Sequence, residues 1–158
     1  MKPVRVLFVC LGNICRSPLA EGVLRERAIE KGLASWLKVD SAGTGAWHIG
    51  DPPDRRSIAV ARRHGIDISG LSGRQVRAED FSGFDLILGM DEDNVAMLKR
   101  LAPAGTADKV QLFLGYATGR SQNVPDPYYE GADAFEALYQ MLDAGCSSLL
   151  ERLGERTS

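Results

Sequence analysis

The sequence is poor in the features that mark membrane, nucleic-acid-binding or disulfide-rich proteins. No run approaches the ~20 apolar residues that a membrane helix needs. The formal net charge is only -2, so no basic field points to nucleic acid. Cysteine occurs three times in 158 residues, and no spacing of histidine and cysteine suggests zinc. We therefore expect a soluble protein that needs no metal or other cofactor and binds neither nucleic acid nor a membrane.

The cysteine content also bears on the compartment. Three cysteines do not make a disulfide framework, which favours a reducing cytoplasm. The apolar stretch at the N-terminus is short, carries Arg5 and leads directly into a polar loop. This pattern predicts a buried first strand rather than a signal peptide. We expect a cytoplasmic monomer, and export without a signal peptide is left open.

Apolar runs alternate with helical patterns along the chain. Strands are predicted at residues 4–9, 37–41, 84–90 and 110–114. Helices are predicted to begin at N-caps Ser17, Asp54 and Asp91 and near Asp133. The alternation predicts one α/β domain over residues 1–158, with a central four-stranded parallel sheet flanked by helices on both faces. Residues 42–53 and 117–131 stay irregular, and long loops in compact domains are often functional.

Ligands of such sheets bind beyond the carboxyl ends of the strands, so we expect a ligand site at the end of the first strand. The chain there reads Cys10-Leu11-Gly12-Asn13-Ile14-Cys15-Arg16-Ser17-Pro18. A turn between a strand and a helix start can direct backbone N–H groups at a phosphate. The Gly-Lys-Ser/Thr ending of nucleotide-binding loops is absent. This segment therefore predicts a phosphate cradle of another kind, in which Arg16 can hold two oxygens.

Cys10 lies at the base of this cradle, and two interpretations compete for it. Free cysteines are often simply buried, and a lone strand cysteine favours that interpretation. Helix N-termini and nearby cations, however, lower thiol pKa values from roughly 8.5 to between about 3.5 and 7.5. With Arg16 six positions on and Ser17 able to donate to the sulfur, the pattern favours a nucleophile that attacks phosphorus and forms a phosphocysteine.

The run from Val9 to Pro18 resembles the active-site signature of the low-molecular-weight protein tyrosine phosphatases. The similarity covers nearly the whole chain, including Arg74-Gln75 and Met90-Asp91. It implies the phosphotyrosine phosphatase I-like fold, and hydrolysis of phosphotyrosine in proteins and of small aryl phosphates.

A phenolate leaves poorly without a proton, so this chemistry needs a general acid. Prolines on both sides of Asp126 stiffen the second irregular loop. An isolated Asp-Pro is more often a turn residue that accepts local N–H bonds. The run Asp126-Pro127-Tyr128-Tyr129, however, resembles the general-acid loop of the same family, which implies that Asp126 acts first as acid and then as base.

The resemblance also implies roles for the residues around the nucleophile. It implies that phosphate is bound by the loop residues Leu11, Gly12, Asn13, Ile14, Cys15 and Arg16. Asn13, Ser17 and Ser41 resemble the family's hydrogen-bond set that holds this loop in shape. Trp47 is placed opposite Tyr128, with Tyr129 beside it, so that an aryl ring fits between aromatic walls.

The remaining cysteines and histidines are less informative. Cys15 is a candidate redox partner that traps an oxidised Cys10 as a disulfide, or it merely packs beneath the loop. Cys146 lies on an apolar helical face and is predicted to be core. We assign no catalytic role to His48 or His64.

Two related functions compete with the phosphatase prediction. Thiol-coupled arsenate reductases of similar fold carry a further cysteine pair near the third strand, and residues 81–97 contain no cysteine. A phosphocysteine carrier of similar fold needs a stable intermediate and has no use for Asp126 and Arg16. The identity of the physiological substrate is left open.

Overall fold

The first strand, β1 (Val4–Cys10), forms the centre of the sheet because its side chains are apolar on both faces. Leu7 and Val9 enter one apolar cluster, whereas Val6 and Phe8 enter the other, and all four are fully buried. The structure is a computed structural model and describes residues 2–156.

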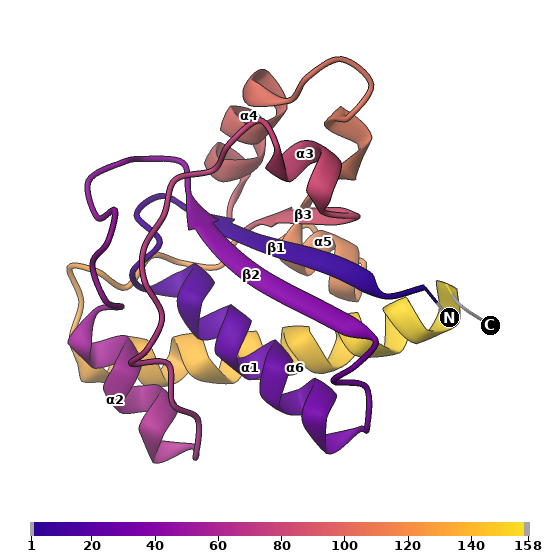
Figure 1. Ribbon diagram of the computed structural model, residues 1–158. Helices are drawn as coiled ribbons and strands as arrows, with labels where there is room; N and C mark the ends of the chain where they lie inside the picture. The colour runs from indigo at the N-terminus through magenta and orange to yellow at the C-terminus, as the bar shows by residue number, and fades with distance from the viewer. Residues whose placement is uncertain (1, 157–158) are drawn as a thin grey trace.

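Three further strands complete a parallel sheet in the order β2-β1-β3-β4 (Figure 1). They are β2 (Leu37–Gly43), β3 (Leu86–Gly89) and β4 (Val110–Leu112). Cys10 pairs with Gly43, and Val9 pairs with Gly89. The carboxyl ends of the three neighbouring strands β2, β1 and β3 therefore meet at one edge.

Helices cover both faces of the sheet, as predicted (Figure 1). On the larger cluster lie α1 (Arg16–Glu30), α2 (Arg55–Arg63), α5 (Phe113–Thr118) and α6 (Ala132–Arg156). On the other lie α3 (Asp80–Gly83) and α4 (Glu92–Leu101). Cys146 of α6 is fully buried, which confirms it as core. No helix formed by residues 2–156 has the length and apolar character needed to cross a membrane.

Two of the three predicted N-caps are confirmed, and the third is wrong. Asp54 accepts the backbone N–H of Arg56, and Asp91 accepts that of Asn94. Ser17 does not cap its helix, because α1 already begins at Arg16 with Cys15 as the N-cap. The Ser17 hydroxyl is instead turned to the Cys10 sulfur, 3.0 Å away.

The fourth strand is shorter than predicted. It ends at Leu112, and the chain turns at once into α5. The Phe113 ring packs edge-to-face on Phe8 at 5.3 Å between ring centroids, under the sheet rather than in line with it. The apolar residues that suggested a longer strand thus belong to a buried helical turn. At the other irregular stretch, β2 extends to Gly43, so the loop begins at Thr44.

The packing of α1 gives a stability prediction at Gly22. Alanine in place of a helical glycine ordinarily stabilises by about 1 kcal/mol. A Cβ on Gly22, however, would lie 2.4 Å from Cγ2 of Ile68, a stiff and buried β-branched side chain. We expect Gly22→Ala to lower the free energy of unfolding by about 1–3 kcal/mol in urea titrations. Gly154→Ala, with no atom within 4 Å of its new Cβ, is the control and should not destabilise. Equal stability of the two variants would contradict the predicted clash.

Candidate active site

The Cys10 sulfur forms the floor of the site at the carboxyl end of β1. It lies 3.0 Å from the Ser17 hydroxyl and accepts the backbone N–H of Asn13 at 3.3 Å. The Asn13 amide donates to the Ser17 oxygen at 2.8 Å. The Ser17 oxygen thus accepts from Asn13, and its one hydroxyl proton can be donated either to the sulfur or to the Ala42 carbonyl at 3.4 Å.

Asn13 holds the phosphate loop, residues 10–16, in its shape. Its backbone is in the left-handed region at φ 57°, which asparagine tolerates better than most residues. Besides Ser17, its side chain donates to the Ser41 hydroxyl at 3.0 Å and accepts the backbone N–H of Arg74. Ser41 in turn donates to the buried carboxylate of Glu21 at 2.7 Å. Asn13, Ser17 and Ser41 are not among the residues that line the cleft, which agrees with the predicted supporting role but leaves Asn13 outside the lining where it was also expected to bind phosphate.

Arg16 is almost fully buried and is fixed by partners outside the phosphate loop. Its Nη1 donates to the Asp91 carboxylate at 2.7 Å and to the Val124 carbonyl at 3.0 Å. Its Nη2 lies 3.8 Å from Asp126. The N-cap residue of α1, Cys15, offers no side-chain acceptor to the first-turn amides. Helix amides and guanidinium together suit a bound anion.

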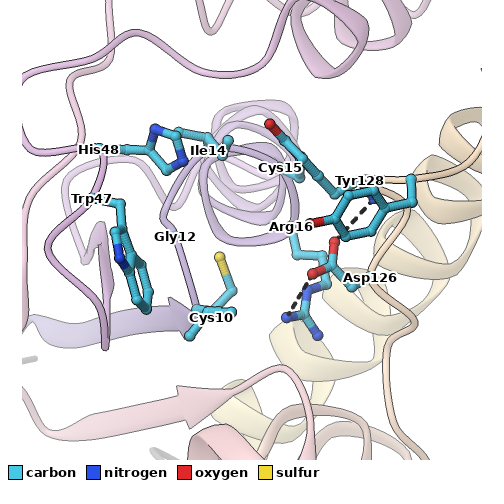
Figure 2. A pocket seen from close by; sticks show the side chains of 11 residues that line it. Cys10, Gly12, Ile14, Cys15, Arg16, Trp47, His48, Asp126 and Tyr128 are labelled. Carbon is cyan, nitrogen blue, oxygen red and sulfur yellow. Dashed lines mark hydrogen bonds and ion pairs between the residues drawn. The ribbon is translucent and has the colours of Figure 1, made fainter.

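A cleft of about 340 Å³ opens above the sulfur. Figure 2 shows Trp47 and His48 on one side of Cys10 and Asp126 and Tyr128 on the other. The residues lining it are Cys10, Leu11, Gly12, Ile14, Cys15, Arg16, Trp47, His48, Asp126, Tyr128 and Tyr129. The structure thus gathers the predicted nucleophile, arginine, acid and aromatic walls around one cavity, whereas their chemical roles stay predictions.

The aromatic walls reach into solvent. All three aromatic residues are exposed: Trp47 by 71%, Tyr129 by 94% and Tyr128 by 38%. The Trp47 ring lies directly over Gly45, where a Cβ would fall 1.9 Å from the indole. Gly45 thus leaves the room that the indole occupies. The aromatic residues at the mouth of the cleft are therefore in contact with solvent.

Asp126 makes the local turn contact that one interpretation of its sequence expected, and it also lines the cleft, as the other interpretation required. One carboxylate oxygen accepts the backbone N–H of Tyr128 at 3.1 Å, which is the local turn contact. The other oxygen faces Arg16 and the cleft. The turn contact therefore orients the carboxyl instead of removing it from the site.

Cys15 lines the same cleft as Cys10, and both are free thiols. Burial, reinforced by the negative charge of Asp54, raises the pKa of Cys15 to about 12. This thiol therefore keeps its proton at neutral pH. Burial raises the pKa of Cys146 as well.

Sequence reasoning missed several residues that hold the site. Asp91 was assigned only a capping role, yet its second oxygen binds Arg16. Its position two residues after β3, whose carboxyl end adjoins that of β1, was the available signal. Glu21, Arg74 and the backbone of Val124 carried no local signal, because their contacts join distant segments. His48 lines the cleft, whereas His64 stacks on Tyr139 and pairs with Glu136, which is a structural role.

The described residues also bear on metal binding. Within residues 2–156, no group of three or more histidine, cysteine or acidic side chains could hold a metal ion. The positive charge at the site comes from Arg16 and the helix N-terminus. A cysteine sulfur beneath such a cradle, faced by a carboxyl group, is the arrangement that the predicted cysteine-dependent phosphatase requires.

Comparison with known proteins shows the family of phosphatases to which the chain belongs. The family model of the low molecular weight phosphotyrosine protein phosphatases matches residues 5–158. The low molecular weight protein-tyrosine-phosphatase YfkJ of Bacillus subtilis (strain 168) is 44% identical over 148 residues, covering 93% of this chain and 94% of that protein. The human low molecular weight phosphotyrosine protein phosphatase is 42% identical over 149 residues, with 93% and 94% covered. The chain belongs to this family of phosphatases.

Solved structures agree with this assignment. The crystal structure of Bacillus subtilis YfkJ matches with a TM-score of 0.92 at 40% identity, over 100% of this chain and 99% of that one. A protein tyrosine phosphatase from Entamoeba histolytica, with Hepes in its active site, also gives a TM-score of 0.92, at 35% identity and with 98% and 99% covered. The predicted fold class is therefore confirmed.

The Arg16–Asp91 contact gives a prediction on anion binding. Asp91→Asn removes the negative charge that holds the guanidinium but keeps a good N-cap for α4. We expect inorganic phosphate to inhibit this variant about tenfold more weakly, the equivalent of one charge-assisted hydrogen bond. Competitive inhibition of 4-nitrophenyl phosphate turnover measures it. Asp93→Asn, an exposed change on the same helix, is the control. An unchanged inhibition constant for Asp91→Asn would contradict the role.

Proposed function

We propose that this protein hydrolyses phosphotyrosine in proteins, and small aryl phosphates, through a phosphocysteine intermediate. The observation that carries the proposal is the setting of the Cys10 sulfur, which accepts the Asn13 N–H and lies 3.0 Å from the Ser17 hydroxyl, in the cleft that Arg16 and Asp126 also line. The Asn13 N–H, together with a Ser17 hydroxyl that donates in the proposed reaction, suits negative charge on that sulfur. No cofactor or metal enters the proposed reaction.

In the first step, Arg16 and the amides of the phosphate loop bind the phosphoryl oxygens. The Cys10 thiolate attacks phosphorus in line with the tyrosyl oxygen, and the S–P bond forms as the P–O bond breaks. Charge that develops on the equatorial oxygens is met by the guanidinium, which Asp91 and Val124 already hold in place. Little reorganisation is then needed at the moment of reaction.

Asp126 supplies the proton that the leaving phenolate needs. It stands beside Arg16 on the side of the cleft opposite Trp47 (Figure 2). In the second step its carboxylate accepts a proton from water, and the water oxygen attacks phosphorus and displaces the thiolate. Inorganic phosphate leaves, and the protonated carboxyl and the thiolate are restored.

The cleft walls favour an aryl ester. Trp47 and Tyr128 flank the cavity, so a phenyl ring can pack between them, a contact of about 0.5–1.5 kcal/mol beyond burial. A phosphoserine side chain is shorter and carries no ring for these walls. The protruding tyrosine of a phosphoprotein matches the open, aromatic mouth.

The nucleophile and the acid can be tested separately in metal-free assays. We expect Cys10→Ser to abolish turnover of 4-nitrophenyl phosphate and phosphotyrosine peptides, because the serine hydroxyl stays protonated.

We expect Asp126→Asn, which keeps the turn acceptor for Tyr128, to lower kcat/KM by about 10²–10⁴-fold for phenyl phosphate and much less for 4-nitrophenyl phosphate. Turnover by Cys10→Ser would contradict the proposal. Equal losses in kcat/KM of Asp126→Asn on the two esters would show that Asp126 is not the general acid.

We further propose that Cys15 protects an oxidised Cys10. Peroxide converts the Cys10 thiolate to sulfenic acid and releases hydroxide. The Cys15 sulfur then displaces water from that sulfenic acid and forms the Cys10–Cys15 disulfide. The high pKa of Cys15 keeps it out of the first reaction, so oxidation begins at Cys10.

The pKa of Cys15 makes the second oxidation step depend on pH. Below about 12 its thiolate fraction rises about tenfold per pH unit, so disulfide formation should gain on competing reactions as pH rises. We expect mass spectrometry after stoichiometric peroxide and a sulfenic-acid trap to show more disulfide relative to trapped Cys10 at pH 8.5 than at pH 6.5. Cys15→Ser is the control and should give only trapped or over-oxidised Cys10. Over-oxidised Cys10 without any disulfide in the wild type would contradict the proposal.

A further inference from the structure

Arg56, at the start of α2, joins the two loops that build the active site. Its guanidinium donates to the backbone carbonyls of Tyr128 at 2.9 Å and of Glu130 at 3.0 Å. Both belong to the acid loop, residues 124–130, which carries Asp126. Arg56 does not line the cleft, so any effect on the reaction passes through that loop.

The same guanidinium is anchored on the other side by Asp54. Arg56 Nε and Nη2 bind the two Asp54 carboxylate oxygens at 3.0 and 2.9 Å, which is the bidentate geometry that suits arginine. The Asp54 backbone N–H donates to the carbonyl of Ile14 in the phosphate loop at 2.8 Å. A continuous path of hydrogen bonds therefore runs from the phosphate loop through Asp54 and Arg56 to the acid loop.

The rest of the acid loop shows why this path matters. Before Asp126 the loop is fixed at Val124, whose N–H binds the Met90 carbonyl and whose carbonyl binds Arg16. After Asp126, no side chain among residues 2–155 other than Arg56 donates to the carbonyls of residues 127–130. Asp126 thus stands between two anchors, one at Val124 and one at Arg56.

Ring contacts hold Arg56 in this place. Its guanidinium lies 4.6 Å from the ring centroid of Phe135 in α6 and 5.6 Å from that of Tyr128. Phe135 is buried, so the cation rests on a fixed surface. Charge also agrees: the Arg56 guanidinium, bonded to the carboxylate, lowers the pKa of Asp54, so the pair stays ionised at neutral pH.

We propose that Arg56 is a positioning residue that fixes the acid loop over the phosphate loop and thereby sets where the Asp126 carboxyl meets the leaving oxygen. The inference rests on the proposed function, because it concerns proton transfer by Asp126. It assigns Arg56 no contact with substrate. Its loss should therefore act on leaving-group protonation and leave the nucleophile unchanged.

The test compares kcat/KM for phenyl phosphate and 4-nitrophenyl phosphate, since the ratio of two esters of similar shape cancels general losses in binding or folded fraction. We expect Arg56→Gln to lower kcat/KM for phenyl phosphate by about 10- to 100-fold, and for 4-nitrophenyl phosphate by less than about threefold. Arg55→Gln makes the same charge change at the exposed neighbouring residue and should leave the ratio unchanged. Arg56→Lys cannot bind Asp54 and both carbonyls at once, so its ratio of kcat/KM for the two esters should lie between those of Arg56→Gln and the wild type. If Arg56→Gln does not fold, Arg56→Lys takes its place in the test.

A double variant decides whether Arg56 acts through Asp126. In the Asp126→Asn background, Arg56→Gln should change the ratio of kcat/KM for the two esters no further. Iodoacetate should alkylate Cys10 at the wild-type rate in each of these variants. Equal losses on both esters, an additive loss in the double variant, or slowed alkylation of Cys10 would each overturn the inference. If Asp126→Asn responds to the leaving group and Arg56→Gln does not, only this inference fails. If Asp126→Asn itself shows no such response, the proposed acid fails and the inference fails with it.

Discussion

The site depends on the hydrogen bonds of one buried side chain, Asn13. Its amide joins the phosphate loop to the start of α1 through Ser17 and to β2 through Ser41, while its carbonyl oxygen accepts the Arg74 N–H. The backbone of the same residue, at φ 57°, places its own N–H on the Cys10 sulfur. Such a conformation costs free energy and persists only where its surroundings impose it. Because every polar atom of that side chain finds a partner, the network can rigidify the loop instead of destabilising the core.

Sheet topology explains why this loop meets the acid loop at all. The order β2-β1-β3 brings three carboxyl ends to one edge, so segments that follow β1, β2 and β3 converge there. Asp91 lies two residues after β3, and the N–H of Val124 binds the carbonyl of Met90, the residue that follows the strand. Arg16 reaches both of them from the first strand's loop. The parallel sheet thus brings Cys10 and Asp126, the proposed nucleophile and acid, to one cleft, although they lie far apart in the chain.

Much of this arrangement was predictable where the information is local. The apolar run of β1, the caps at Asp54 and Asp91, and the loop from Cys10 to Arg16 each show in a few adjacent residues. Prediction failed where tertiary contacts override local pattern: Ser17 serves the sulfur instead of capping α1, and Phe113 turns under the sheet to meet Phe8. Long-range partners such as Glu21 and Arg56 could not be found, because a charged residue on a helix most often faces solvent and nothing adjacent marks its exceptions.

Two carboxylates lie near the Arg16 guanidinium, at different distances. Asp91 lies 2.7 Å from the guanidinium and is the closer partner, whereas Asp126 lies 3.8 Å away and is half exposed. Asp91 and the Val124 carbonyl both accept from Nη1 of Arg16, so together they fix the guanidinium. Asp126 lies beyond hydrogen-bonding distance of Arg16, and one of its oxygens accepts the Tyr128 N–H while the residue lines the cleft. The two carboxylates therefore hold different positions: the nearer one fixes Arg16, and the farther one lines the cleft, where the proposed reaction needs a proton donor.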